Sequence, residues 1–173
     1  MRCPACGYDN LAGADECAGC HGDLRQEDLP EPTDSLAQAL TVDPVQKLIP
    51  CQPLTLTEDT PIREAVAKLV ETGRNCVLVT RQGSLCGILT ERDILMKIAD
   101  RYEDLADEPV SAFMSRDPES LTVDCPAVYG LNRMTAGDYR HIPIVENDVP
   151  VGVISIRDIL ALLVENDSSA VGE

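Results

Sequence analysis

The sequence has no tryptophan, and aromatic residues make up only 3% of its 173 residues, although hydrophobic residues make up 44%. Its core therefore has to be built from Val, Ile, Leu and Ala. Basic side chains are also scarce, because 14 Lys and Arg stand against 30 Asp and Glu and give a formal net charge of −16. A negative field of this strength repels phosphate backbones and anionic lipids, so nucleic acids and membrane surfaces are poor candidates for a partner.

Long apolar runs are missing as well, so the sequence predicts no membrane span. Its start, MRCPACGYDN, contains no apolar stretch of the kind that a signal peptide needs. We therefore expect a cytoplasmic protein whose eight cysteines are thiols or metal ligands rather than disulfides. No Ser/His/Asp or Cys/His order has local support and only two histidines are present, so we do not expect an enzyme.

Four of the cysteines form a set, C-x2-C-x10-C-x2-C, made of Cys3, Cys6, Cys17 and Cys20. Two such pairs can complete the tetrahedron of thiolates that a structural Zn²⁺ takes, and the stretch resembles a short zinc ribbon. The alternative is four unrelated thiols, which the paired spacing disfavours. A segment of about 20 residues cannot bury a core, so metal binding has to supply its folding energy. His21 is expected to be a solvated turn residue rather than a ligand.

Composition divides the chain into a ribbon (1–22), an acidic linker (23–43), two repeats (44–108 and 109–166) and a disordered tail (167–173). The linker holds six acidic residues, one Arg and two prolines, which is typical of a solvated tether. We therefore expect the linker to keep the ribbon separate from the repeats.

The two repeats match without a gap when the chain is shifted by 65 residues, as GILTERDIL (87–95) and GVISIRDIL (152–160) illustrate. In the first repeat the pattern predicts a short strand, a helix over 62–72 that ends at Gly73, strands near 75–80 and 85–89, and a helix that begins at Thr90. The second repeat gives strands over 121–123, 141–145 and 149–154, a helix over 127–136 and a helix after Ser155. The expected class is α/β (α+β): two β-α-β-β-α repeats packed through their sheets, plus the zinc ribbon.

Each repeat ends in Gly, two apolar residues, a hydroxyl and an Asp three positions later. Thr90 with Asp93, and Ser155 with Asp158, fit a helix capping box, which needs no ligand. Capping does not explain a glycine inside an apolar strand, which usually marks close approach of another group.

A ligand would use the whole motif. Backbone N–H groups at a helix N-terminus attract phosphate, a carboxylate one turn later can accept both hydroxyls of a ribose, and Arg92 or Arg157 can offset phosphate charge. The glycines of this motif, Gly87 and Gly152, would give the ligand room.

The order β-α-β-β-α, the repeated motif and the tandem arrangement resemble a pair of CBS domains, the Bateman module, over residues 44 to about 164. The resemblance implies that Asp93 and Asp158 hold the ribose of an adenine nucleotide of the AMP, ADP or ATP class. It also implies that Thr90 and Ser155 contact ribose or phosphate.

In the second repeat, Arg140 and His141 enter the middle strand, where a basic pair reaches ligand phosphate in many CBS proteins. His141 is equally well explained as a satisfied, half-buried imidazole. The first repeat has Asn75 and Cys76 at these places, so we expect one site to be better equipped than the other.

These observations predict a regulatory, ligand-sensing protein that changes conformation on nucleotide binding and passes the change to an unidentified protein partner. The resemblance implies a homodimer, which exposed apolar helix positions such as Ile98 and Leu162 would favour. Two alternatives stay open: a nucleic-acid-associated regulator that uses the ribbon, and a ligand-free scaffold. The ribbon disfavours the first, because Arg2 is its only basic residue. Two of the other thiols, Cys76 and Cys86, are expected in the core.

Overall fold

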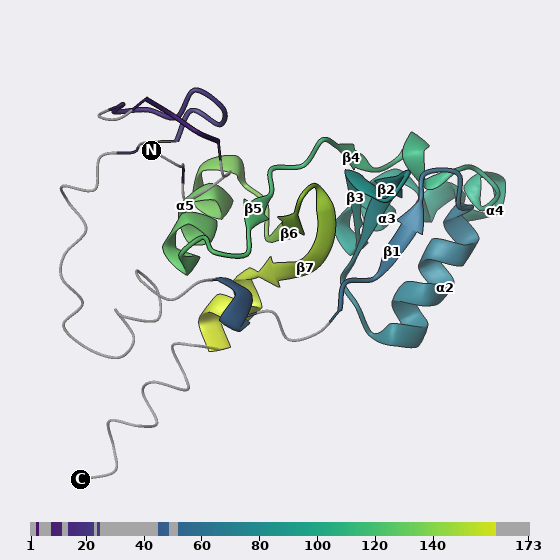
Figure 1. Ribbon diagram of the computed structural model, residues 1–173. Helices are drawn as coiled ribbons and strands as arrows, with labels where there is room; N and C mark the ends of the chain where they lie inside the picture. Colours follow the sequence, from purple (N-terminus) through teal and green to yellow (C-terminus); the bar gives the residue numbers. More distant parts are fainter. Residues whose placement is uncertain are drawn as a thin grey trace, which may run out of the picture. The chain divides into compact units, whose positions relative to one another are not determined.

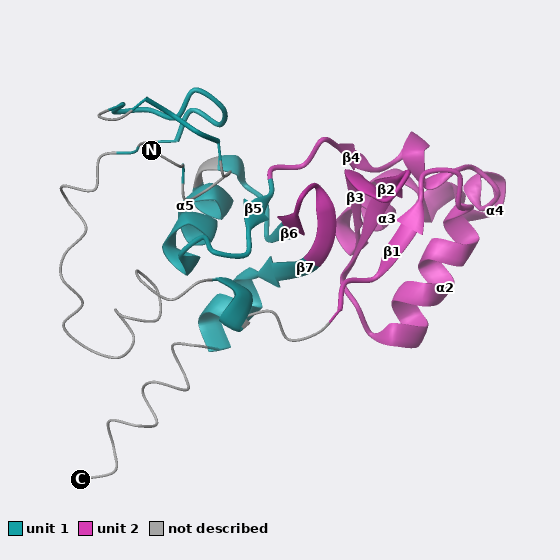
Figure 2. Ribbon diagram, in the orientation of Figure 1, with its two compact units in different colours: residues 1–50, 120–144, 152–173 teal, residues 51–119, 145–151 magenta. Residues whose placement is uncertain are grey.

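The computed structural model describes residues 3, 8–11, 14–22, 24, 45–48 and 52–161 (Figure 1). It divides into two compact units (Figure 2): unit 1 comprises Met1–Pro50, Ser120–Ile144 and Gly152–Glu173, and unit 2 comprises Cys51–Glu119 and Val145–Val151. Cys6, Leu162, almost all of the acidic linker and the tail lie outside the described residues. The proposed boundaries of ribbon, linker and repeats stay a prediction.

The first repeat folds as β-α-β-β-α. Its elements are β1 (Thr55–Thr57), α2 (Ile62–Thr72), β2 (Cys76–Arg81), β3 (Ser84–Thr90) and α3 (Glu91–Lys97). Strand β1 is parallel to β2, β2 is antiparallel to β3, and β4 (Ser115–Arg116) pairs with β3 to complete a four-stranded sheet. Three short helical segments, η2 (Ala99–Arg101), α4 (Tyr102–Leu105) and η3 (Val110–Ala112), lead away from this repeat.

The second repeat has the same order of elements. Strands β5 (Leu121–Thr122), β6 (His141–Glu146) and β7 (Val149–Ser155) form a three-stranded sheet, and α5 (Ala127–Gly137) follows β5. Residues 156–161 are helical up to the last described residue. The predicted mixed α/β class with two β-α-β-β-α repeats is therefore confirmed.

The core of the first repeat is aliphatic, as the composition requires. On α2, Ile62, Ala65 and Leu69 are buried, and Val66 packs against the same cluster, so one face of this helix is apolar and covers the core. The sheet contributes buried residues such as Val77, and the expected placement of Cys76 and Cys86 in or against the core holds.

The expectation that Ile98 is exposed is wrong. Helix α3 ends at Lys97, and Ile98 is its C-cap, whose N–H donates to the carbonyl of Ile94, a residue that packs against the core. Ile98 is fully buried in the core of the first repeat. The exposed apolar side chains of α3 are instead Leu95, which is 71% exposed, and Met96, which is 77% exposed.

The helices α2 and α5 end in the left-handed conformation at positions 65 residues apart. Gly73 takes φ 64° after α2, and Asp138 takes φ 52° after α5. Glycine adopts this conformation without strain, whereas Asp adopts it at some cost. A Cβ atom at Gly73 would meet nothing within 4 Å, so packing does not require a glycine there and the backbone conformation does.

The residues that lead into each repeat are hydrogen-bonded to the other repeat. In unit 2, the Val110 N–H donates to the Thr60 carbonyl at 2.9 Å. In unit 1, which contains the 3-10 helix η1 (Val45–Leu48), the Val45 N–H donates to the Cys125 carbonyl at 2.7 Å. The donors and the acceptors of these two bonds are each related by the 65-residue repeat, so the two contacts are equivalent.

Candidate functional site

Thr90 and Asp93 form a complete capping box at the start of α3. The Asp93 N–H donates to Thr90 Oγ1 at 3.2 Å, and the Thr90 N–H and hydroxyl donate to Asp93 Oδ2 at 3.0 and 2.6 Å. The capping interpretation of TERD is therefore confirmed. These bonds fix the Asp93 carboxylate, because one of its oxygens accepts from both Thr90 donors.

The second oxygen of Asp93 is also in use. Lys97 Nζ lies 2.7 Å from Asp93 Oδ1, and the same ammonium group donates to the Phe113 carbonyl at 2.7 Å. Burial raises the pKa of the Asp93 carboxyl, but hydrogen bonds from Lys97 and Thr90 outweigh it, and the pKa lies below its ordinary value. The carboxylate of the first repeat is thus charged and occupied by groups of its own chain.

Ser155 and Asp158 form the equivalent pair in the second repeat. The Ser155 N–H and hydroxyl donate to Asp158 Oδ2 at 2.6 and 2.7 Å. Position 162, which corresponds to Lys97, is a leucine and lies outside the described residues. Within the described part of the chain, Asp158 Oδ1 has no hydrogen-bond donor, so the two repeats differ at the oxygen that a ligand would use.

The fold brings Arg140 to the same end of the second sheet. The Ile156 N–H, in the first turn after Ser155, donates to the Arg140 carbonyl at 3.1 Å. Arg140 is exposed and His141 is half-buried at the start of β6. In the first repeat the Glu91 N–H donates to the Asn75 carbonyl at 3.0 Å, so an uncharged side chain holds the corresponding place.

Arg92 and Arg157 are exposed, each one residue before the motif Asp. Among the described contacts, neither arginine reaches the carboxylate of its own motif. Their proposed part in binding phosphate therefore stays a prediction.

Gly87 has a packing partner within its own unit. A Cβ atom there would overlap the Met114 sulfur and would lie 3.0 Å from the Met114 Cγ and Cε atoms. Met114 is buried in the core of the first repeat, just before β4. The close approach that the sequence led us to assign to a ligand is made here by Met114, because β4 pairs alongside β3 at Gly87.

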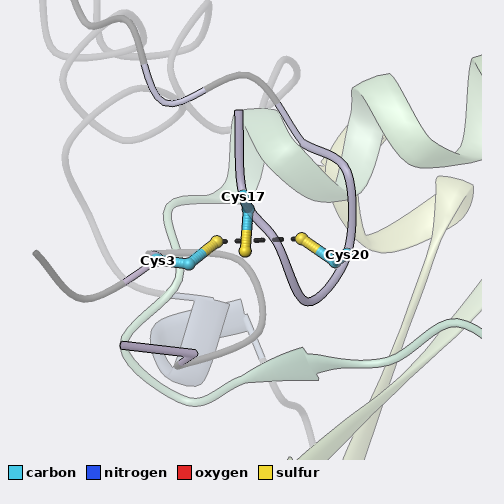
Figure 3. Close-up of side chains that lie close together, drawn as sticks. All are labelled: Cys3, Cys17 and Cys20. Atoms are coloured by element: carbon cyan, nitrogen blue, oxygen red, sulfur yellow. Dashed lines mark hydrogen bonds between the residues drawn. The ribbon is translucent and has the colours of Figure 1, made fainter. Parts of the chain in front are cut away.

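The ribbon cysteines that the structure describes converge. The sulfur atoms of Cys3, Cys17 and Cys20 point toward one another (Figure 3) and all lie within 4.8 Å of each other. Cys3 and Cys17 are buried, and the Cys3 and Cys20 sulfurs are 3.7 Å apart. Cys6, the fourth predicted ligand, lies outside the described residues.

Hydrogen-bond donors surround these sulfurs. The Gly19 N–H donates to Cys17 Sγ at 3.3 Å, and Asn10 Nδ2 donates to the same sulfur at 3.4 Å. Such donors stabilise thiolates and orient metal ligands, so the residues present fit a thiolate-bound metal ion. His21 faces Glu16, with its Nδ1 2.8 Å from Glu16 Oε1, which agrees with its expected place outside the ligand set.

One residue near the ribbon was missed by the sequence analysis. Arg133, on α5, donates from Nη2 to Cys20 Sγ at 3.3 Å. The pKa of the nearby Cys125 thiol is raised to about 12, mainly by burial and also by Cys3 and Cys20, while Arg133 opposes the shift. The ribbon therefore contacts the second repeat, contrary to the expectation that the linker keeps them separate. The sequence did hold one signal for this contact: four positions before Arg133 stands Tyr129 rather than an acidic residue, so Arg133 has no acidic partner at that place on its own helix.

The comparisons with known proteins bear on the repeats. The CBS domain model matches residues 45–100 and 110–165. The CBS domain-containing protein CBSCBSPB5 of Arabidopsis thaliana is 34% identical over 117 residues, which cover 67% of this chain and 21% of the relative. The chain thus spans about a fifth of the length of that relative. No helix among the described residues is long and apolar enough to span a membrane.

Solved structures share the fold. A CBS-domain containing protein from Agrobacterium tumefaciens matches with a TM-score of 0.64 and 28% identity, over 71% of this chain and 95% of that one. The CBS domain pair of protein MJ0100, solved in complex with 5′-methylthioadenosine and S-adenosyl-L-methionine, matches with a TM-score of 0.63 and 21% identity, over 72% of this chain and 98% of that one. The two ranges that match the CBS domain model coincide with the two β-α-β-β-α repeats. The chain therefore belongs to the CBS domain family, as a protein with two CBS domains.

Proposed function

We propose that this protein is a regulatory sensor that binds an adenine nucleotide of the AMP, ADP or ATP class through its CBS pair, with the second repeat as the stronger site. The observation that carries this proposal is the state of Asp158. Capping bonds from Ser155 hold one carboxylate oxygen, and the other has no donor within the described residues. A carboxylate held in this way is ready to accept hydrogen bonds from ribose hydroxyls.

The neighbouring groups suit the rest of a nucleotide. The backbone carbonyl of Arg140 accepts from the first turn after Ser155, so the exposed guanidinium group of this residue is available to a phosphate bound near that turn. His141 adds an imidazole N–H that can donate a hydrogen bond to phosphate or to another group of the protein. The aliphatic strand β7, with half-buried Val153, offers a surface of the kind that a flat base packs against.

The relatives support the ligand class. MJ0100 has a CBS pair of the same fold, and both of the ligands in its structure contain adenosine. Their common adenosine group is what the proposed carboxylate and apolar wall would recognise. S-adenosyl-L-methionine therefore belongs among the compounds to test, beside the three nucleotides.

The signal would pass through a change of conformation or of assembly. We propose a homodimer, because the last helices of both repeats carry equivalent exposed apolar residues. Leu95 is 71% exposed and Leu160, which is 65 residues later, is 51% exposed. A protein partner would then respond to the ligand-bound state of the dimer.

The ribbon would hold one structural Zn²⁺ through Cys3, Cys6, Cys17 and Cys20. Four thiolates fill the tetrahedral shell, so the ion would supply folding energy and no open position for chemistry. The proposed sensing role rests on the repeats and does not depend on this ion.

Calorimetric titration of the intact protein with AMP, ADP, ATP and S-adenosyl-L-methionine tests the sensing role. We expect Asp158→Asn, which keeps an acceptor for the cap, to weaken binding strongly while the melting temperature changes little. Asp93→Asn is the matched control and should have the smaller effect. Absence of heat and of thermal shift with all four compounds would favour a ligand-free scaffold, and salt-dependent binding to RNA or DNA would favour a nucleic-acid regulator.

A further inference from the structure

The contact between Arg133 and Cys20 joins two parts of the chain that lie 113 positions apart in sequence. Arg133 lies on α5 of the second repeat, and Nη2 donates to the Cys20 sulfur at 3.3 Å. Gly22 makes room for this approach, because a Cβ there would lie 3.0 Å from Arg133 Nη2 and 3.4 Å from Cys20 Sγ. The glycine that follows the second cysteine pair thus allows the guanidinium group to reach the sulfur.

Charge favours the same contact. Residues 1–22 contain Arg2 as their only basic side chain, against the acidic Asp9, Asp15 and Glu16. Four thiolates around one divalent ion add further negative charge, and thiolate ligands are stabilised by donors in their surroundings. A guanidinium group stays charged and gives up water more readily than an ammonium group, which suits it to such an interface.

The basic residue at this position makes different contacts in the two repeats. The position equivalent to Arg133 in the first repeat is Lys68, which pairs with Glu64 on the same helix at 3.7 Å. The position equivalent to Glu64 is Tyr129, so the second repeat has no carboxylate four positions before Arg133. The basic residue of α5 therefore contacts a thiol of the ribbon where its counterpart on α2 forms an ordinary helix pair.

We infer that Arg133 is a positioning residue that binds the metal-loaded ribbon to the second CBS domain, so that metal binding at the cysteines stabilises that domain as well. Thermodynamic linkage gives the consequence: a ligand that binds only the folded, docked state raises the stability of everything that must fold with it. Removal of the metal should then loosen α5, although no ligand of the metal lies in the second repeat.

The experiment uses the full chain with one equivalent of Zn²⁺ or Co²⁺ and three variants. Arg133→Met keeps the apolar stem and removes the guanidinium group, Gly22→Ala crowds that group and the Cys20 sulfur, and Lys68→Met is the matched control on the first repeat. Zinc affinity is measured by competition with a chromogenic chelator. We expect Arg133→Met to weaken binding roughly 10- to 100-fold, as loss of a group that contacts a metal ligand does. Gly22→Ala should weaken it in the same direction, and Lys68→Met should bind zinc like wild type.

Two further readouts separate this role from a general loss of stability. The thiolate-to-cobalt charge-transfer band should shift in Arg133→Met and stay in place in Lys68→Met. Hydrogen exchange of the α5 amides should speed up when wild type is stripped of metal, and metal should no longer slow it in Arg133→Met. Equal zinc affinity and equal hydrogen exchange of the α5 amides in wild type and Arg133→Met would overturn this inference and leave the proposed zinc site in place. A wild type that binds neither metal would overturn both the inference and the structural zinc, while nucleotide titration would still test the sensing role.

Discussion

Lys97 Nζ lies 2.7 Å from Asp93 Oδ1. The equivalent oxygen in the second repeat, Asp158 Oδ1, has no hydrogen-bond donor among the described residues. A ribose that uses Asp93 has to displace this ammonium group or share the carboxylate with it. The first repeat therefore differs from the second at the Asp that we propose as a ligand-binding residue.

Lys97→Met should strengthen nucleotide binding at the first repeat. An exposed pair of this kind contributes about 0–1 kcal/mol, so the gain should be no more than roughly 5-fold in affinity. Titration calorimetry in the Asp158→Asn background isolates the weaker site. Lys68→Met removes a lysine elsewhere in the same repeat and should change nothing. A loss of affinity in Lys97→Met would contradict the prediction, because it would mean that Lys97 helps to bind the ligand.

Discrimination against 2′-deoxynucleotides should be large at the second repeat. If Asp158 accepts both ribose hydroxyls, the deoxy compound loses one hydrogen bond, which costs about 1–3 kcal/mol, or roughly 5- to 150-fold in affinity. Competition of AMP with 2′-deoxy-AMP on wild-type protein measures the ratio. Equal affinities would exclude ribose as the group that Asp158 recognises.

The charge of Asp93 should stabilise the fold in a defined pH range. Its folded-state pKa lies below the ordinary value of 3.8, so its contribution is present above that value and is lost as the pH falls through the folded-state pKa. Asp93→Asn should cost about 1 kcal/mol at pH 7, and this cost should become smaller as the pH falls below the ordinary pKa of the carboxyl group. Urea unfolding at several pH values measures this difference, with Asp104→Asn as an exposed control; a constant difference at all pH values would contradict it.

Gly87→Ala should destabilise the first repeat through Met114. The added methyl group overlaps the Met114 side chain in a packed core, which costs about 1–3 kcal/mol. A double-mutant cycle with Met114→Ala should recover part of that cost, because the smaller side chain leaves space. If the cost is the same in both backgrounds, Met114 is not the reason for the glycine.

The helix ends at Gly73 and Asp138 should respond in opposite directions. Gly73→Ala places a Cβ in the left-handed conformation with no compensating contact and should cost about 1–2 kcal/mol. Asp138→Gly removes the strain at the equivalent place and should stabilise the second repeat, in part offset by chain entropy. Urea denaturation of both variants gives the two free energies, and the same sign for both would refute the equivalence.

Much of the fold was predictable because the sequence contains the same pattern of strands and helices twice. The 65-residue repeat fixes the order of strands and helices, and the capping pairs Thr90–Asp93 and Ser155–Asp158 follow from local spacing alone. Contacts between segments with no common period could not be predicted in this way. Met114 against Gly87 and Arg133 with Cys20 depend on how strands pair and how distant segments pack. The pair of Lys97 with Asp93 is different, because its spacing of four residues on one helix was visible in the sequence and was overlooked.

The error at Ile98 has a different origin. Ile98 follows Ile94 by four positions and Ile94 packs against the core, so helical periodicity itself places both residues on the buried face of α3. The same periodicity places Leu95 and Met96 away from that face, and these are the exposed apolar residues.

The equivalent bonds from Val110 to Thr60 and from Val45 to Cys125 have a consequence for any attempt to divide the chain. In both bonds the acceptor belongs to one repeat and the donor to the segment that leads into the other repeat. A single repeat cut from this chain would therefore keep its acceptor and lose the donor, which makes it an incomplete folding unit.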